Sequence, residues 1–192
     1  MIANSSRFLQ VYDKLLFFLK FIRSPRQIGS ITPSSSALSR MMLEPIQWED
    51  GKVIVELGAG TGVFTRAIQQ RRSKESCFVL FEKDEYLRQR LCEQLNDVSC
   101  FPDASELSEV LASEGVQEAD YIVSGLPFAN FSLEQRETIM TQVHSSLKQD
   151  GLFITFQYSL QMKESLQRKF SKVKIKLVVG NLPPAFVYVC QK

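Results

Sequence analysis

The sequence has few metal-binding side chains and no cysteine pair with metal-site spacing. It contains one histidine, His144, and four cysteines, Cys77, Cys92, Cys100 and Cys190, none of which forms a CxxC motif. We therefore expect no metal. The cysteines are far apart and fall in or beside expected strands and helices, which favours buried free thiols in a reducing cytoplasm.

Long apolar runs, repeats and low-complexity tracts are also missing. The run at 15–19 ends at Lys20, far short of the roughly 20 apolar residues that span a bilayer. No small-residue cleavage site follows it, which argues against a secretory signal. A length of 192 residues fits a single domain, 1–192.

The net charge of +2 is unevenly distributed. Residues 1–40 carry six basic side chains against one aspartate, and residues 161–176 carry six against one glutamate. Two basic patches beside an acidic body indicate an anionic partner, either a membrane surface or nucleic acid. An ordinary solvated surface explains the second patch equally well.

Residues 5–24 read as an amphipathic helix with one apolar stripe. Phe17 and Phe21 fall outside that stripe, on the face that carries Lys14 and Lys20. Such a helix can lie flat at a membrane interface. The alternative is a helix packed over the sheet, with both rings closing the active site. We assign 1–48 to an N-terminal membrane and substrate cap and 49–192 to the core.

From residue 52 onward, short apolar runs alternate with amphipathic stretches, which predicts an α/β fold with a mostly parallel sheet. Only 180–184 separate the last two strands, so these should form an antiparallel hairpin at the sheet edge. The expected strands are 53–57, 76–82, 97–101, 119–124, 151–157, 172–179 and 185–190. The expected helices are 62–71, 84–95, 105–113, 132–148 and 159–170.

A glycine-rich turn follows the first strand, with Glu56 at the strand end and Gly58, Gly60 and Gly62 in the turn. Glycines let the backbone turn sharply and approach a ligand closely. The segment resembles the first motif of S-adenosylmethionine-dependent methyltransferases, E/D-x-G-x-G-x-G. That resemblance implies a Rossmann-like class I methyltransferase fold, with seven strands and the last one antiparallel, and places Glu56 near the amino acid end of the cofactor.

Two further acids follow the next strands. Glu82 ends the second strand about twenty residues beyond the turn, where a carboxylate can accept both ribose hydroxyls. Its alternative is a solvated acid at a strand end. The family resemblance implies that Asp103 contacts the adenine amino group and adds Lys83 and Ala104 to the cofactor-binding residues.

The fourth strand is followed by a predicted substrate motif, which we take as the catalytic segment: Ser124, Gly125, Leu126, Pro127 and Phe128. It resembles the N-L-P-Y or N-P-P-Y motif of amino-directed methyltransferases, including the rRNA adenine dimethylases. Gly125 stands where the asparagine would bind a planar base amine, which argues against adenine methylation. The Ser124 hydroxyl is a neighbouring substitute.

Three stretches, 23–35, 123–128 and 181–189, together resemble the bacterial phospholipid N-methyltransferases, small soluble enzymes that methylate phosphatidylethanolamine. The resemblance runs from about residue 17 to the C-terminus. It implies a cytoplasmic, peripherally membrane-associated enzyme with a phospholipid substrate and no nucleic-acid partner. It adds Gly29, Ser30 and Thr32 to the cofactor-binding residues and Arg23 to the substrate and membrane residues Lys14, Phe17, Lys20, Phe21 and Tyr188.

The reaction requires an amine that has lost its proton, held in line with the activated methyl group. His144 falls within the expected helix 132–148, so we expect a packing role and proton loss to water or a carboxylate. Phe21, Phe128 and Tyr188 are candidates for an aromatic contact with methylated ammonium, or for core packing. An RNA adenine N6-methyltransferase and a non-catalytic membrane-binding protein on this scaffold remain alternatives.

Overall fold

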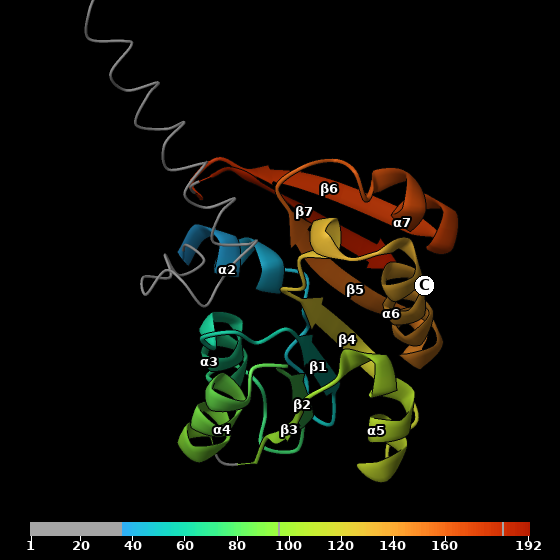
Figure 1. The fold of residues 1–192 in the computed structure, drawn as a ribbon. Coiled ribbons are helices and arrows are strands. Elements are labelled where there is room, and N and C mark those ends of the chain that lie inside the picture. The colour runs from blue at the N-terminus through green and yellow to red at the C-terminus, as the bar shows by residue number, and fades with distance from the viewer. Residues whose placement is uncertain (1–35, 96, 182) are drawn as a thin grey trace, which may run out of the picture. The chain divides into compact units, whose positions relative to one another are not determined.

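The computed structural model describes residues 36–95, 97–181 and 183–192. These form a seven-stranded sheet of order β3-β2-β1-β4-β5-β7-β6, covered by helices (Figure 1). The strands are β1 (Val53–Leu57), β2 (Cys77–Phe81), β3 (Ser99–Phe101), β4 (Ala119–Ser124), β5 (Leu147–Gln157), β6 (Lys172–Val178) and β7 (Ala185–Gln191). The helices are α2 (Ser36–Leu43), α3 (Val63–Gln69), α4 (Glu85–Gln94), α5 (Leu107–Ser113), α6 (Leu133–Ser146) and α7 (Lys163–Lys169), with 3-10 turns η2 (Ala104–Glu106) and η3 (Phe128–Asn130).

The strand directions confirm the predicted fold class. β1 pairs in parallel with β2 and β4, β2 with β3, and β4 with β5. β7 lies antiparallel between β5 and the edge strand β6. The short connection 179–184 dictates this hairpin, because a parallel crossover needs about a dozen residues.

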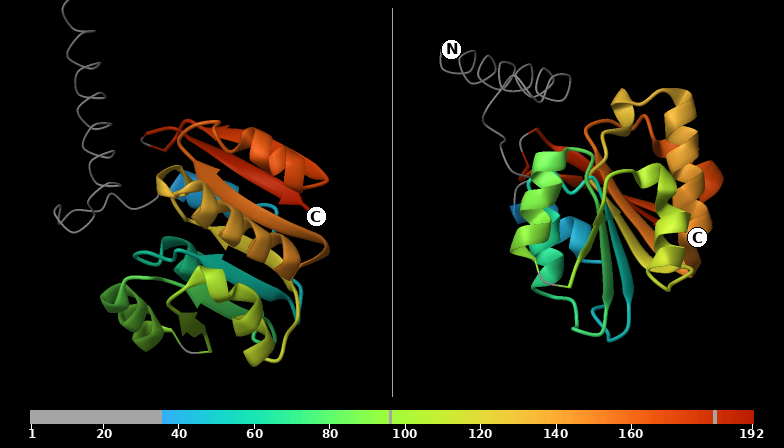
Figure 2. Two further views of the ribbon diagram at one scale, coloured as in Figure 1. Left: turned by 45° about the vertical axis from the view of Figure 1, so that its right-hand side comes forward. Right: turned by 60° about the horizontal axis from the view of Figure 1, so that its bottom comes forward.

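The sheet separates two layers of helices (Figure 2). The larger core packs α5, α6 and α7 against one face, through side chains such as Leu111, Val143 and Leu166. α2 and α3 cover the opposite face through Met42 and Ile68, and α4 lies on the same side. All five residues of β1 are buried, as expected for a central parallel strand with helices on both faces.

Two elements begin four residues away from the predicted position, β5 earlier and α7 later. α6 ends at Ser146 and β5 begins at Leu147, because Leu147 is fully buried and pairs with Ala119 at the start of β4. α7 begins only at Lys163. The preceding Ser159 instead accepts a hydrogen bond from the Tyr188 hydroxyl at 3.0 Å, which holds this segment over β7.

α2, which is in the segment 1–48 that we assign to the cap, packs on the core. Leu38, Met42 and Leu43 of α2 are completely buried with Ile54. The membrane and substrate role of this segment stays a prediction. No described helix is long and apolar enough to cross a bilayer.

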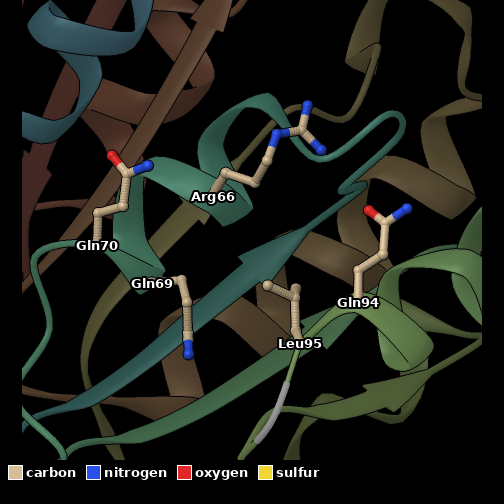
Figure 3. A pocket seen from close by; sticks show the side chains of 5 residues that line it. All are labelled: Arg66, Gln69, Gln70, Gln94 and Leu95. Atoms are coloured by element: carbon tan, nitrogen blue, oxygen red, sulfur yellow. The ribbon is translucent and has the colours of Figure 1, made fainter.

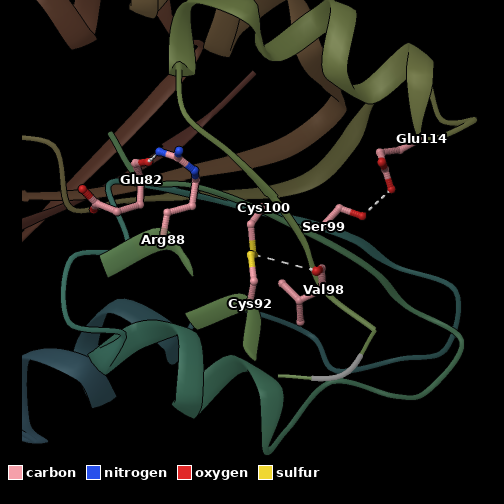
Figure 4. Close-up of a disulfide and its surroundings, with 7 residues drawn as sticks. All are labelled: Glu82, Arg88, Cys92, Val98, Ser99, Cys100 and Glu114. Atoms are coloured by element: carbon pink, nitrogen blue, oxygen red, sulfur yellow. Dashed lines mark hydrogen bonds between the residues drawn. A yellow bond between two sulfur atoms is a disulfide. The ribbon is translucent and has the colours of Figure 1, made fainter. Parts of the chain in front are cut away.

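The expectation of four buried thiols is wrong for most of the cysteines. Cys92 and Cys100 are joined in a disulfide, with their Cα atoms 6.3 Å apart (Figure 4). α4 runs back along the sheet to β3, which brings together two residues only eight positions apart. Cys77 is half-buried, and only Cys190 is a buried free thiol.

Candidate active site

The described candidate site residues, apart from Tyr188, lie at the carboxyl ends of the parallel strands. Glu56 is within the last two residues of β1, and Glu82, Asp103 and Gly125 follow β2, β3 and β4. Parallel strands bring their carboxyl ends to the same edge, where this class of fold binds ligands. Sheet topology thus gathers residues that are up to 69 positions apart in the chain.

The glycine turn is tied to the neighbouring strand. The backbone nitrogens of Gly58 and Ala59 both donate to the Phe81 carbonyl, at 2.8 and 3.0 Å. Gly58 has φ of 76°, and a Cβ there would lie 2.9 Å from Leu126 Cδ2. The left-handed backbone therefore favours glycine, and a Cβ there would displace the Leu126 side chain of the 125–127 turn.

Glu56 is fully buried with an unsatisfied carboxyl group. Neither of its oxygens, nor the hydroxyl of Thr65, has a hydrogen-bond partner of good geometry among the described residues. Burial raises the pKa of Glu56 to about 7; the nearby Thr65 opposes part of this increase, and the charge of Glu82 adds to it. A buried acid without a partner is uncommon in proteins and fits a site for the cationic amino acid end of S-adenosylmethionine.

Glu82 reaches the glycine turn from the end of β2. Its Oε2 accepts the Gly60 N–H at 2.6 Å, and its Oε1 accepts the Asp84 N–H at 2.8 Å. A carboxylate offers about four acceptor positions, so two remain for hydroxyl groups. This geometry agrees with a ribose-binding role, which stays a prediction.

Replacing Glu82 with alanine should therefore weaken S-adenosylmethionine binding. Loss of a charged acceptor costs roughly 1.5–3 kcal/mol, and the Gly60 backbone loses its anchor. Calorimetry would measure the change. Glu85→Ala is the matched control, because Glu85 is an exposed acid three residues away whose side chain contacts Gln89. Unchanged affinity in a folded Glu82→Ala variant would remove Glu82 from the cofactor site.

The other predicted cofactor residues lie beside this edge. Asp103 Oδ1 accepts from the Ser105 backbone nitrogen at 2.9 Å and from its hydroxyl at 2.7 Å. These bonds hold the pKa of Asp103 below its usual value, so the carboxylate is ionised and positioned to accept a further donor. Ala104 is buried at the start of η2, and Lys83 is exposed. Gly29, Ser30 and Thr32 lie outside the described residues.

The 125–127 turn lies directly against the glycine turn. The Gly125 N–H donates to the Leu57 carbonyl at 2.8 Å, and a Cβ on Gly125 would lie 2.8 Å from the Gly58 carbonyl oxygen. That separation is shorter than real Cβ atoms show, and the obstacle is backbone. The glycine at this position therefore has a steric reason: a base-binding asparagine does not fit here without moving the cofactor loop.

Three predicted residues face the interior instead of the site. Ser124 is completely buried, and its hydroxyl accepts the Leu126 N–H at 3.2 Å, so it stabilises the turn instead of binding substrate. Phe128 is fully buried against Phe131 and Phe153. Tyr188 is also fully buried, which contradicts the predicted contact with substrate or membrane. Leu126 is half-buried and Pro127 exposed, so these side chains of the motif are the ones near solvent.

The sequence analysis missed Gln157, which supports the turn. Its side-chain nitrogen donates to the Leu126 carbonyl at 3.1 Å from the end of β5. The sequence signal for this role was a polar residue, glutamine, at the end of the strand segment FITFQ.

The second basic patch is partly neutralised by ion pairs. Lys169 lies 3.4 Å from Glu137, Lys176 lies 2.7 Å from Glu44, and Arg168 lies 3.9 Å from Glu164. The other basic residues of this segment, Lys163, Lys172 and Lys174, are exposed. The N-terminal substrate and membrane residues, Lys14, Phe17, Lys20, Phe21 and Arg23, lie outside the described residues.

Two features lie apart from the site. His144 is in the last turn of α6, with its ring 5.6 Å from that of Phe170, which agrees with the predicted packing role. A surface hollow of about 270 Å³ lies between α3 and α4, and no predicted site residue lines it (Figure 3). Its lining residues are Arg66, Gln69, Gln70, Gln94 and Leu95.

Comparisons with known proteins show the family of this chain. Residues 35–180 match the methyltransferase small domain family. The chain is 33% identical over 184 residues to an ornithine lipid N-methyltransferase of Singulisphaera acidiphila, covering 93% of this chain and 96% of that protein.

Solved structures share the fold at low sequence identity. Precorrin-6Y C5,15-methyltransferase of Geobacter metallireducens superposes with a TM-score of 0.65 at 13% identity, covering 86% of this chain and 94% of that one. A Burkholderia thailandensis 1,6-didemethyltoxoflavin-N1-methyltransferase with bound S-adenosylhomocysteine has a TM-score of 0.64 at 16% identity, covering 100% and 91%. At these identities the likeness is one of fold.

The fold and the glycine turn define an S-adenosylmethionine-dependent methyltransferase. The chain belongs to the methyltransferase small domain family, and it is an N-methyltransferase. The alternative of a non-catalytic membrane-binding protein is thereby dropped, and the predicted distant similarity to rRNA adenine dimethylases receives no support.

Proposed function

We propose that this enzyme methylates the primary amine of a membrane lipid, with phosphatidylethanolamine and ornithine lipid as the two candidate acceptors. The observation that carries the proposal is the contact between the substrate turn and the cofactor turn at Gly58 and Gly125. This contact supports the proposal because the predicted acceptor segment lies against the predicted cofactor loop, with no room there for the asparagine side chain that recognises a planar base.

The chemistry suits a small, unconjugated amine. S-adenosylmethionine supplies an activated methyl group, so the chain has to bind, orient and desolvate the amine at about 3 Å from it. Leu126 is half-buried and Pro127 exposed next to the glycine turn, and these apolar groups can exclude water from the reacting amine. We expect the ammonium to lose its proton to water or a nearby carboxylate.

The two candidate lipids share the reacting group. The relative from Singulisphaera acidiphila is named for ornithine lipid, whereas the resemblance of 23–35, 123–128 and 181–189 points to phosphatidylethanolamine. Each lipid presents a primary amine on a flexible chain at a bilayer surface. An enzyme for either has to work at a membrane, so we propose a cytoplasmic protein that associates peripherally with anionic bilayers.

A labelled-methyl assay tests the proposal. The full chain is incubated with radiolabelled S-adenosylmethionine and one of three acceptors: phosphatidylethanolamine in detergent micelles, ornithine lipid in detergent micelles, or total RNA. We expect label in a lipid extract and none in RNA. Label in RNA with none in either lipid would overturn the proposal in favour of the RNA adenine alternative, and comparison of the two lipids identifies the preferred acceptor.

A further inference from the structure

The exposed large apolar side chains of the described residues are all at the end of the sheet where the parallel strands finish, which we call its carboxyl end. They are Tyr86, Leu133, Leu160, Leu177 and Val179, which are 70%, 77%, 45%, 53% and 74% exposed. Tyr86 is near the start of α4, which follows β2; Leu133 begins α6, which follows β4; and Leu160 follows β5. Leu177 and Val179 are at the end of β6. This is the end that carries the cofactor and substrate turns (Figure 1).

Four of these five residues lie on the same side of the sheet, at the carboxyl ends of its strands. We call Leu133, Leu160, Leu177 and Val179 the apolar rim. The side chains of Val173 and Ile175 on β6 point to the face of the sheet that α6 and α7 cover. Side chains alternate along a strand, so Leu177 points to the same face. β4 and β6 are three strand spacings apart in the sheet, about 15 Å.

Strand register places the ends of β5 and β6 level with each other. Gln157 of β5 and Leu177 of β6 both pair with Phe186 of β7, so they are two strand spacings, about 10 Å, apart. The Tyr188 hydroxyl holds Ser159, the residue before Leu160, over β7. Phe186, between the two strand ends, is only half-buried.

We propose that the apolar rim inserts into the bilayer and thereby holds the candidate active site at the membrane that contains the lipid substrate. This inference rests on the proposed function, and it locates the membrane contact on the catalytic domain. The partner is a lipid surface because the rim consists of separate aliphatic side chains, at the start of α6, after β5 and at the end of β6, which a fluid phase can surround. A stable protein interface instead needs about 20–30 residues on each side.

The charged side chains beside the rim are of both signs. Lys163 is exposed one turn from Leu160, and its backbone nitrogen donates to the Leu160 carbonyl at 3.0 Å. Glu134, next to Leu133, and Glu164, next to Lys163, are also exposed. Lys163 forms no ion pair with any described residue. Tyr86 differs: it lies on the opposite face of the sheet, follows Asp84 and Glu85 in the chain, and is therefore excluded from the rim. It provides a control whose exposure, 70%, lies within the 45–77% range of the rim residues.

Vesicle flotation of the full chain tests the rim, using phosphatidylethanolamine vesicles that contain phosphatidylglycerol. We expect Leu160→Ser/Leu177→Ser to lower vesicle binding about a hundredfold, since removing a buried leucine from an apolar phase costs about tenfold or more. Leu133→Ser/Val179→Ser, which alters the other two residues of the rim, should act in the same direction. Tyr86→Ser should bind as the wild type does. Thermal unfolding verifies that each variant is folded.

Activity on dispersed lipid separates this inference from the proposed function. With a short-chain phosphatidylethanolamine or ornithine lipid below its micelle concentration, the rim variants should keep wild-type kcat/KM and lose rate only on vesicles. Absence of lipid methylation by the wild type in every format overturns the proposed function itself. Methylation with unchanged vesicle binding in both rim variants overturns the rim alone. A dimer in sedimentation that the rim substitutions dissociate would also overturn it, because the rim would then bind a second copy.

Discussion

Gly125→Asn should reduce kcat/KM about a hundredfold without creating activity on RNA. The substitution rebuilds the asparagine of base-methylating enzymes, yet its Cβ would lie 2.8 Å from the Gly58 carbonyl oxygen. One of the two turns has to move, and a displacement of about 1 Å at a reacting centre costs about a hundredfold in rate. Radiolabel transfer to lipid and to RNA measures both parts of the prediction.

Gly115→Asn is the matched control for this variant. A Cβ at Gly115 meets nothing within 4 Å, and its φ of 76° is a conformation that asparagine adopts more readily than most residues. It should keep wild-type activity. If Gly125→Asn is folded and fully active, the two turns are not in close contact, and the steric argument against base methylation fails.

Glu56 should make the stability of the cofactor-free protein fall as the pH rises from about 5 to 8. Burial raises the pKa of Glu56 from 4.5 to about 7, with partial opposition from Thr65. Because the folded-state pKa is the higher one, the stabilising contribution is complete below pH 4.5 and is lost as the pH rises through about 7. A shift of this size corresponds to about 3 kcal/mol.

Glu56→Gln should remove this pH dependence, since glutamine is neutral throughout the range and similar in shape. Urea unfolding at pH 5 and pH 8 gives the change in unfolding free energy for each protein. We expect the wild type to lose about 3 kcal/mol more than Glu56→Gln does. Glu109→Gln, at an exposed position on α5, should behave as the wild type. Equal losses in the wild type and Glu56→Gln would show that the buried carboxyl ionises without a penalty.

Local patterns in the sequence identify much of the architecture. The apolar strands predict the parallel sheet because a central strand buried on both faces needs a continuous apolar run, as in VIVEL. The glycine turn is similarly readable, since Gly58 has the left-handed backbone that its motif implies. The boundary errors at Leu147 and Lys163 arose where a tertiary contact, with Ala119 or through Tyr188 to Ser159, outweighed helical periodicity.

Side-chain direction at the site was not readable in the same way. Tyr188 and Phe128 are in motifs that the sequence marks as functional, yet both are completely buried. An aromatic residue next to a functional turn can point to either face, and only packing of the helices decides which. The disulfide between Cys92 and Cys100 was missed for a related reason, because the return of α4 along β3 brings them together.

The sequence by itself determined the class of protein. A strand, a glycine turn and a helix follow in order, with Glu56 near the end of the first strand and Glu82 directly after the second, and each of these features depends only on neighbouring residues. The tertiary structure alone decided why position 125 is glycine. Gly58 and Gly125 are 67 positions apart in the chain and meet only because β1 and β4 are adjacent in the sheet. The tertiary structure also brought the residues of the apolar rim together from α6, the segment after β5 and the end of β6, since a surface exists only after the chain has folded.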